Sequence, residues 1–283
     1  MLVNVNGQWL TRKEAKISIL DRGFLFGDGV YETIRTYYKR PFALDKHLKR
    51  LEYSAEKLGI KLPDLSFITS VINEGIERLS ESIVDQQEIY IRLIVTRGES
   101  EFSLRITTIS PTFVAIFKPL ETSNKEGVKI KISTVRKIPS ESIDPKIKGL
   151  GQIDKILARL EMTKEVYEVI MLSFNGYVAE GTMSNIFMIS NERLITPSLD
   201  TGILNGITRD TVIEIAKEKG IKVEERLVEL KELFNAEEVF LTHTSAEIVP
   251  VKYVEEIEKD VGPVTKLLKA GFREYIERWI ESY

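Results

Sequence analysis

The stretch Asn175-Gly-Tyr-Val-Ala-Glu-Gly-Thr-Met-Ser-Asn-Ile-Phe187 places a carboxylate, Glu180, between two segments that have the composition of buried strands. The apolar run 169–174 precedes it, and the apolar run 186–189 follows it. Burying a charged group is costly unless another group compensates its charge. Either the rest of the chain or a ligand must therefore supply a positive partner for Glu180.

Composition narrows the chemistry that this chain can perform. The chain has 283 residues, of which 43% are hydrophobic and 29% charged, and its formal net charge is −3. These values are typical of a globular protein with one or two domains, and they argue against a strongly basic nucleic-acid surface. The absence of cysteine excludes disulfides, thiol nucleophiles and cysteine-bound metals. The two histidines, His47 and His243, lie in no metal-binding motif, so we predict no metal site.

The sequence also predicts a location for the protein. No basic segment followed by a long apolar run opens the chain, so no signal peptide is expected. No stretch approaches the roughly 20 apolar residues of a membrane span. We therefore predict a cytoplasmic protein without membrane contact.

The pattern of apolar residues predicts an α+β fold. Alternation predicts strands at 30–38, 88–96, 112–117 and 128–134, and a period near 3.6 predicts helices at 44–58, 65–79, 152–166, 208–219 and 263–283. Asn6-Gly7 between short alternating runs predicts a hairpin. Strands and helices do not alternate strictly, which favours α+β over a doubly wound sheet. The polar segment 119–127 is predicted to link an N-terminal domain, 1–118, to a C-terminal domain, 128–283.

Three segments are candidates for binding an anion. Asn205-Gly206 precedes the helix predicted at 208–219, and Thr208 is predicted to cap that helix, which leaves its first N–H groups available to a phosphate. The turn 241–247 interrupts two apolar strands and offers hydroxyls and backbone donors. Arg50 lies on the polar side of the helix at 44–58. Taken alone, each segment has an ordinary reading: a capped helix, a polar turn and a solvated arginine.

In order along nearly the whole chain, these segments resemble the class IV pyridoxal 5′-phosphate (PLP) aminotransferases, a family that includes branched-chain aminotransferase, D-amino acid aminotransferase and aminodeoxychorismate lyase. Each matching segment is a weak signal alone, but their ordered set is specific. The segments are Asp21–Glu32, His47–Leu51, Lys148, Val178–Asn185, Asn205–Arg209 and Thr244–Pro250.

The resemblance implies an architecture. It is the two-domain fold of type IV PLP enzymes, with a small N-terminal α/β domain, a larger C-terminal pseudo-barrel domain and PLP in the cleft between them. It also implies a homodimer in which the neighbouring subunit contributes a loop, here around 97–105.

The resemblance also assigns roles in binding the cofactor. Lys148 corresponds to the lysine that forms the Schiff base with PLP and then moves a proton as general base and acid; Lys146 and Lys155 are neighbours of the same type. Glu180 corresponds to the acid that pairs with the protonated pyridine nitrogen, so the ligand is predicted to bring the compensating charge. The phosphate is assigned to Arg50, to the N–H groups of Ile207 and Thr208, and to Thr244.

The substrate site combines features of two branches of the family. Tyr31 matches the active-site tyrosine of D-amino acid enzymes. Tyr90-Ile-Arg92 matches the Tyr-x-Arg pair with which branched-chain enzymes bind acidic and carboxylate groups. Ser245 and Ala246 match the turn that meets the substrate α-carboxylate.

The arginine that binds the substrate carboxylate is left open. Arg97 is our substrate-binding prediction because Thr96-Arg-Gly98 resembles a loop of the D-amino acid enzymes. The Arg-x-His pair of that loop is absent, so Arg35 and Arg105 remain alternatives. Gln152 stands where the family has a tyrosine that contacts the ring hydroxyl, and Tyr31 is the candidate replacement.

The resemblance implies a transaminase that moves an amino group from an amino acid to a 2-oxo acid, such as 2-oxoglutarate, by a ping-pong mechanism. The Tyr-x-Arg pair favours L-branched-chain substrates. A D-amino acid or (R)-amine transaminase is the first alternative. Aminodeoxychorismate lyase and a non-catalytic PLP carrier are more distant ones.

Overall fold

The chain divides into two compact units in the computed structural model, which describes residues 1–283 apart from 85–86, 102, 106–109, 122–126 and 283. The N-terminal unit comprises Met1–Glu121 and Ile147–Gly151; the C-terminal unit comprises Thr122–Lys146 and Gln152–Tyr283. Most of the linker predicted at 119–127 lies outside the described residues. The short segment that carries Lys148 belongs to the N-terminal unit, although its sequence position suggested the other.

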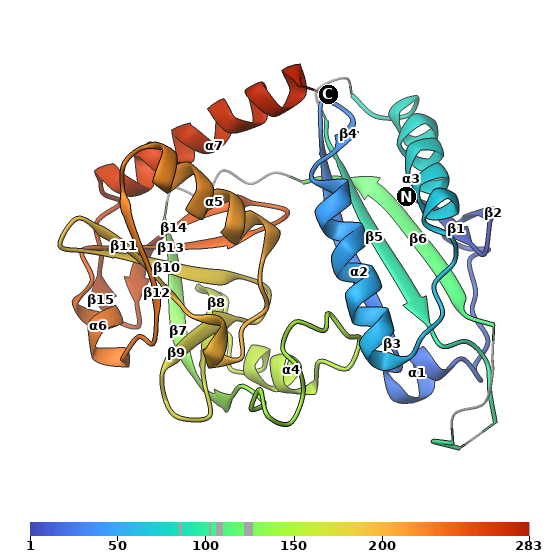
Figure 1. Ribbon diagram of the computed structural model, residues 1–283, viewed down its shortest axis with the longest axis horizontal. Helices are drawn as coiled ribbons and strands as arrows, with labels where there is room; N and C mark the ends of the chain where they lie inside the picture. Colours follow the sequence, from blue (N-terminus) through green and yellow to red (C-terminus); the bar gives the residue numbers. More distant parts are fainter. Residues whose placement is uncertain (85–86, 102, 106–109, 122–126, 283) are drawn as a thin grey trace. The chain divides into compact units, whose positions relative to one another are not determined.

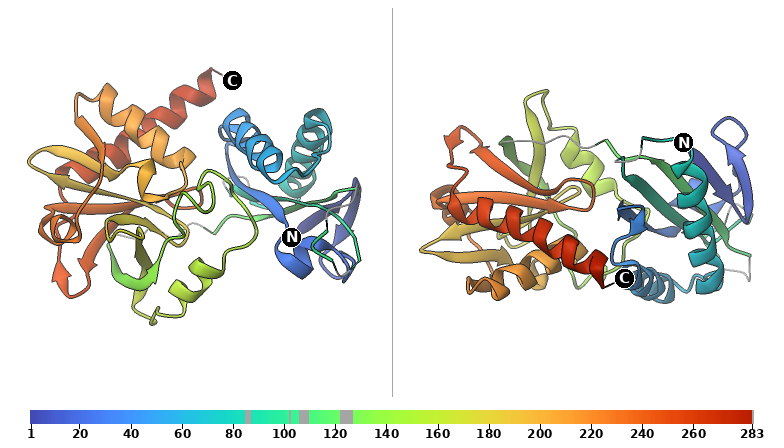
Figure 2. Two further views of the ribbon diagram at one scale, coloured as in Figure 1. Left: turned by 60° about the horizontal axis from the view of Figure 1, so that its bottom comes forward. Right: turned by 90° about the horizontal axis from the view of Figure 1, so that it is seen from above.

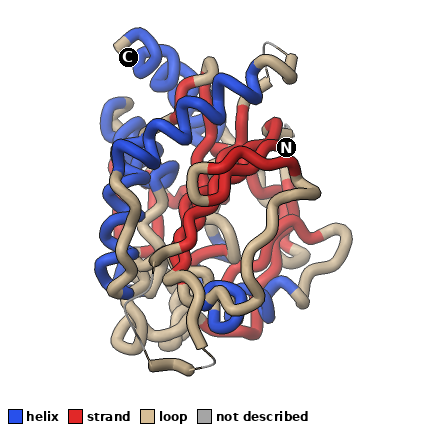
Figure 3. The backbone as a smooth tube through the Cα atoms, turned by 90° about the vertical axis from the view of Figure 1, so that its right-hand side faces the viewer, coloured by secondary structure: helices blue, strands red, loops and turns tan. Residues whose placement is uncertain are grey.

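A six-stranded antiparallel sheet forms the N-terminal unit, in the order β2-β1-β6-β5-β3-β4. The predicted strands and the hairpin at Asn6-Gly7 are confirmed, and the chain begins in this sheet (Figure 3). Both turn residues have positive φ, as a tight hairpin requires. The strands are β1 Leu2–Val5, β2 Gln8–Thr11, β3 Gly29–Tyr37, β4 Arg40–Pro41, β5 Ile89–Thr96 and β6 Thr112–Pro119.

Two helices, α2 (Leu44–Leu58) and α3 (Leu65–Ser80), cover one face of this sheet (Figure 1). Their buried residues recur every three or four positions, as the sequence predicts, and pack on the inward side chains of β3, β5 and β6. A short helix that the sequence analysis missed, α1 (Arg22–Phe26), ends at Gly27, which has a left-handed conformation. The opposite face of the sheet carries half-buried polar and aromatic side chains.

The C-terminal unit contains a nine-stranded mixed sheet in the order β12-β11-β10-β13-β14-β7-β8-β9, with β15 paired to β14. Strand β7 runs parallel to both β8 and β14, whereas most other pairs are antiparallel. The strands are β7 Val128–Arg136, β8 Val166–Leu172, β9 Val178–Gly181, β10 Asn185–Ser190, β11 Arg193–Pro197, β12 Lys222–Arg226, β13 Glu238–His243, β14 Glu247–Val254 and β15 Ile257–Glu258.

Helices surround this second sheet, and α5 and α7 lie side by side (Figure 2). None of the helices that the structure describes combines the length and apolar character needed to cross a bilayer. The helices are α4 Ile153–Arg159, the 3-10 helix η1 Leu199–Thr201, α5 Ile207–Glu218, α6 Leu230–Asn235 and α7 Pro263–Glu281.

Two helix predictions need correction. The helix expected at 152–166 is only α4, because Val166 begins the buried strand β8. Thr208 does not cap α5: the N-cap is Gly206, and Thr208 lies within the first turn. A Cβ atom at position 206 would lie 2.1 Å from Asn185 Oδ1, so the close approach of that side chain requires glycine.

Candidate active site

Glu180 lies on β9, within the stretch 175–187, and is only 3% exposed. Its Oε1 atom accepts a hydrogen bond from Lys137 Nζ at 2.8 Å, and Lys155 Nζ lies 3.5 Å from the same oxygen. Its Oε2 atom accepts a bond from the Leu204 N–H at 3.0 Å. The carboxylate is therefore held at both oxygens by groups of the C-terminal unit.

These contacts fix the charge state of Glu180. Burial raises the pKa of the carboxyl, but the ion pairs with Lys137 and Lys155 and the hydrogen bonds from Lys137 and Leu204 outweigh it and hold the pKa below its usual range. Glu180 is thus an anion at neutral pH. We expected a ligand to supply the compensating charge, but the chain already supplies one in Lys137, for which the sequence carries no local signal.

A second buried acid, Glu168 on β8, shapes the turn that follows Glu180. Its carboxylate accepts hydrogen bonds from Thr182 Oγ1 at 2.7 Å, Ser184 Oγ at 3.2 Å and the Met183 N–H at 3.2 Å. A Cβ atom on Gly181 would lie 2.3 Å from Ser184 Oγ. Glycine is therefore required where the turn folds over this acid, and the turn fixes the end of the strand that carries Glu180.

The N-terminus of α5 is joined to the Glu180 carboxylate. Leu204, two residues before the N-cap, donates its N–H to Glu180, and its carbonyl accepts a bond from Asn185 Nδ2 at 2.9 Å. No side chain caps this helix. The N–H groups of Ile207 and Thr208, in the first turn, have no acceptor within an α-helix and carry the positive end of its dipole. This arrangement suits a phosphate.

The residues Thr244, Ser245 and Ala246 form the turn between β13 and β14, as the resemblance implies. His243, at the end of β13, holds this turn from one side: its Nδ1 lies 3.1 Å from Ser245 Oγ, and its Nε2 lies 2.8 Å from the Tyr167 hydroxyl. The turn therefore presents its hydroxyls from a fixed base, in the same unit as Glu180 and the N-terminus of α5.

Lys148 lies in the N-terminal unit, on a segment that pairs with the first residues of β3. Its carbonyl accepts the Tyr31 N–H at 3.0 Å, and its own N–H donates to Ser54 Oγ at 3.1 Å. Its Nζ lies 5.1 Å from the centroid of the Tyr31 ring. The two alternative lysines are placed differently, since Lys146 is exposed and Lys155 lies beside Glu180.

Arg50, the predicted phosphate ligand, is held by a buried acid that the sequence analysis did not single out. Its Nε and Nη2 atoms donate to the two oxygens of Glu32, at 2.6 and 2.8 Å, and His47 Nδ1 lies 2.7 Å from Glu32 Oε2. Burial raises the pKa of Glu32, but Arg50 and His47 lower it far below its usual range. Burial lowers the pKa of His47, and this effect outweighs the attraction of Glu32.

The face of the N-terminal sheet away from the helices carries the predicted substrate residues Tyr31, Tyr90 and Arg92, all half-buried. The Arg92 guanidinium carbon lies 4.0 Å from the centroid of the Tyr31 ring, the same ring that Lys148 approaches. A lysine amine and a guanidinium are therefore brought together over one aromatic side chain.

Arg97, a predicted substrate ligand, is bound by other groups of the N-terminal unit. It is 7% exposed, donates two hydrogen bonds to Asp28, and donates two more to the carbonyls of Leu58 and Gly59. Four of the five N–H groups of its guanidinium are thus occupied within the N-terminal unit.

The other residues left open by the sequence, Arg35, Arg105 and Gln152, lie in three different parts of the structure. Arg35 is buried, with its guanidinium carbon 4.2 Å from the centroid of the Tyr37 ring. Arg105 is exposed, and part of the loop predicted around 97–105 lies outside the described residues. Gln152 is the N-cap of α4.

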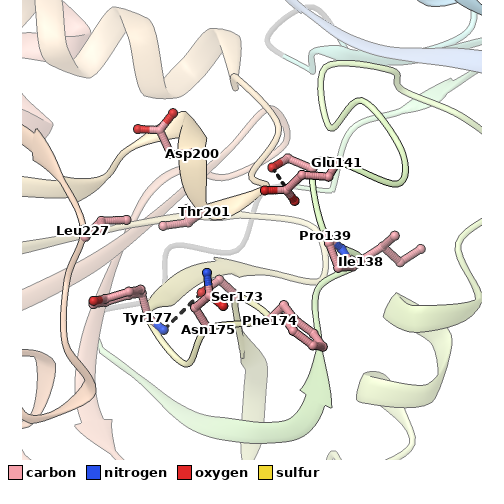
Figure 4. A pocket seen from close by; sticks show the side chains of 11 residues that line it. Ile138, Pro139, Glu141, Ser173, Phe174, Asn175, Tyr177, Asp200, Thr201 and Leu227 are labelled. Carbon is pink, nitrogen blue, oxygen red and sulfur yellow. Dashed lines mark hydrogen bonds between the residues drawn. The ribbon is translucent and has the colours of Figure 1, made fainter.

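A hollow of about 410 Å³ opens elsewhere in the C-terminal unit, and it contains none of the predicted site residues. The turn Ser173–Tyr177 forms one wall, and Asp200 and Glu141 border it (Figure 4). Glu180 and this hollow are therefore separate features of the C-terminal unit.

The described groups define a class of protein. An ionised buried acid beside an uncapped helix N-terminus, a lysine beside an aromatic ring and an arginine fixed by a buried acid fit a cofactor that has a cationic ring, an aldehyde and a phosphate. The comparisons with known proteins agree: residues 29–254 match the family model for class IV amino-transferases. The chain belongs to the class IV aminotransferases.

Individual relatives cover nearly the whole chain. It is 42% identical over 261 residues to a probable branched-chain-amino-acid aminotransferase of Thermotoga maritima, with 89% of each chain covered. It is 33% identical over 281 residues to a D-alanine aminotransferase of Bacillus licheniformis, covering 98% of this chain and 97% of the relative. The fold matches a branched-chain aminotransferase of Thermoproteus uzoniensis, crystallised with norvaline, with a TM-score of 0.87, 30% identity, and 96% and 94% of the two chains covered.

These findings confirm the predicted α+β fold of type IV and the aminotransferase activity. Class IV aminotransferases use PLP, so the chain is a PLP-dependent enzyme.

Proposed function

We propose that this enzyme transfers the amino group of an L-branched-chain amino acid to a 2-oxo acid such as 2-oxoglutarate, by a ping-pong mechanism. The observation that carries the proposal is that Arg92 and Lys148 both approach the Tyr31 ring, at 4.0 and 5.1 Å from its centroid. A guanidinium that contacts the same ring as the predicted catalytic amine suits a substrate that carries a second carboxylate, as 2-oxoglutarate does.

The cofactor contacts follow from the same residues. Glu180 would bind the ring nitrogen, and Arg50, Thr244 and the N–H groups of Ile207 and Thr208 would bind the phosphate. When bound, PLP supplies an electrophilic aldehyde and an electron-accepting ring. The chain supplies the orientation: Glu32 fixes the Arg50 guanidinium, and Leu204 fixes the Glu180 carboxylate.

Lys148 has the role of proton carrier at the substrate Cα. Its backbone is held on both sides, by Tyr31 and Ser54, so its side chain starts from a fixed point. Ser245 and Ala246 would bind the substrate α-carboxylate through the turn that His243 supports.

The test is a set of half-reactions with one amino donor at a time, followed by the absorbance change as the bound cofactor gains the amino group. L-leucine is expected to convert the cofactor quickly, and a second turnover is expected only after 2-oxoglutarate is added. Conversion by D-alanine with none by L-leucine would contradict the substrate assignment while keeping the transaminase activity.

A D-amino acid or (R)-amine transaminase is the second candidate, because Tyr31 occupies the position of the active-site tyrosine of D-amino acid enzymes. D-alanine and an (R)-amine belong in the same assay. A lyase on this scaffold would release pyruvate from aminodeoxychorismate without any amino acceptor, and a PLP carrier would convert no amino donor at all. The homodimer and the cytoplasmic location stay predictions, and the mass of the purified protein in solution tests the first.

A further inference from the structure

Lys137 contacts the acid assigned to the cofactor ring, and neither the resemblance nor the proposed function gives it a role. Its backbone N–H donates to the Leu172 carbonyl at 2.9 Å, which ties the residue to the end of β8. Its side chain is 10% exposed and that of Glu180 is 4% exposed, so water screens the pair only weakly. The Lys137 ammonium is therefore a fixed and largely buried neighbour of Glu180.

The acceptor positions of Glu180 explain how a lysine and a ring nitrogen can share this acid. A carboxylate offers about four lone-pair positions. Lys137 takes one on Oε1 at 2.8 Å, and the Leu204 N–H takes one on Oε2 at 3.0 Å. The other two contacts are long: Lys155 Nζ lies 3.5 Å from Oε1, and Asn185 Nδ2 lies 3.5 Å from Oε2. A ring nitrogen can therefore replace one of these long contacts without displacing Lys137, and the ammonium can stay paired throughout the reaction.

We propose that Lys137 is a permanent counter-ion of Glu180 that weakens the hold of this acid on the proton of the cofactor ring nitrogen. The inference rests on the proposed contact between Glu180 and that nitrogen.

The charge count gives the direction. Glu180 contributes one negative charge, and Lys137 contributes one positive charge within hydrogen-bonding distance. A protonated ring adds a second positive charge to the pair, and Lys155, 3.5 Å from the same oxygen, adds a third. Repulsion between like charges favours the neutral ring. Lys137 is thus a positioning residue that acts on the ring through Glu180 and sets how strongly the ring withdraws electrons.

The experiment uses the full chain reconstituted with PLP that carries ¹⁵N in the ring, because the ¹⁵N resonance distinguishes the protonated from the neutral nitrogen without any turnover. The resonance is recorded as a function of pH for the wild type and for Lys137→Gln, which keeps a hydrogen-bond donor near Oε1 but removes the charge. The titration midpoint of the ring nitrogen is expected to move upward by about one pH unit or more.

Two further variants test the assignment to charge. Lys137→Arg keeps the cation and is expected to restore the wild-type midpoint. Lys129→Gln removes a lysine from β7 that pairs with the exposed Glu256, and it is expected to leave the midpoint unchanged. A Lys137→Gln midpoint equal to that of the wild type overturns the inference.

Glu180→Gln separates this inference from the proposed function. If it alters the ¹⁵N titration while Lys137→Gln does not, the ring contact stands and only the role of Lys137 fails. If it leaves the titration unchanged, the ring contact itself is wrong. Should Lys137→Gln fail to fold, Lys155→Gln removes the second, less buried cation: a smaller upward shift supports the inference, and no shift contradicts it.

Discussion

Glu32 in the N-terminal unit and Glu180 in the C-terminal unit are both buried carboxylates that cations keep ionised, but their partners differ in kind. Arg50 occupies both oxygens of Glu32 with one planar fork, and His47 adds a third contact. Glu180 meets Lys137 at one oxygen and a backbone N–H at the other, and its two remaining contacts, from Lys155 and Asn185, are long at 3.5 Å. One acid is closed by a bidentate pair, whereas the other is held by separate donors, two of which a closer donor can replace.

This difference assigns the two acids different jobs. An arginine fork matches a carboxylate in one fixed geometry, whereas an ammonium is a point charge that fixes no plane. Glu32 therefore orients the guanidinium of Arg50, and in the proposed site the ligand contact belongs to the arginine. In the same proposal Glu180 presents its own carboxylate to the ligand, and Lys137 balances its charge.

The largest expected effect concerns Lys148, the proposed proton carrier. Lys148→Ala is expected to lower kcat by at least about 10³-fold, because it removes the group that carries the proton at Cα. Single-turnover absorbance measurements with L-leucine would show it. Lys146→Ala, an exposed neighbour, is the matched control and is expected to keep full activity. If Lys148→Ala kept near-normal turnover, the assignment of Lys148 as the proton carrier would be wrong.

Glu32→Gln tests the bidentate pair between Glu32 and Arg50. It removes the negative charge that pairs with the Arg50 guanidinium, whose side chain is 13% exposed, and it is expected to destabilise the chain by about 3–5 kcal/mol, measured by chemical denaturation without cofactor. It is also expected to weaken PLP binding, because Arg50 loses its orientation. Glu74→Gln breaks the exposed pair with Arg78 and serves as the control, with little change expected. Equal stability for the two variants would contradict a structural role for Glu32.

Glu168→Gln tests whether the turn after β9 positions Glu180. An amide has one acceptor oxygen and cannot replace both carboxylate oxygens, which accept bonds from Thr182, Met183 and Ser184. The expected loss is about 1–3 kcal/mol of stability, with weaker PLP binding because the turn after Glu180 loosens. Glu165→Gln, at an exposed position, provides the comparison. Unchanged PLP affinity in the Glu168 variant would show that the turn does not position Glu180.

The smallest expected effect is a pH dependence of stability that arises from His47, which contacts Glu32. Burial holds the pKa of His47 in the folded chain below its ordinary value of about 6.5, so the unfolded chain binds more protons as the pH falls below that value. The wild type should therefore lose stability from about pH 7.5 to about pH 5.5, by at most about 1.4 kcal/mol per pH unit for one group. His47→Gln should flatten this slope in denaturation curves; the chain has only one other histidine, His243. An unchanged slope would show that His47 takes up its proton equally well in the folded chain.

The local structure could be predicted largely from the sequence. Helical periodicity gave the limits of α2 and nearly those of α3 and α7, because each buries one apolar stripe. The burial of Glu180 followed from the apolar segments on either side of it. Glu32 carries the same signal, as a charge between Val30 and Ile34 on the inward side of its strand, and so does Glu168 within β8.

The partners of these acids could not be predicted, because they depend on sheet register and on contacts between distant segments. Lys137 and Glu180 are 43 residues apart in the sequence. They meet because β8 pairs with β9 on one side and with the end of β7, which precedes Lys137, on the other. Arg97 was expected at the substrate, yet its carbonyl partners come from the end of α2, 38 and 39 residues away. No local pattern specifies such pairs.

The most direct test of the difference between the two acids is a crystal structure of the chain with PLP bound. We expect a Glu180 oxygen about 2.7–3.0 Å from the ring nitrogen, with Lys137 still paired to that acid and Glu32 still bidentate to Arg50. A ring nitrogen that lies away from Glu180, with the acid engaged by the same protein groups as in the structure described above, would contradict this expectation.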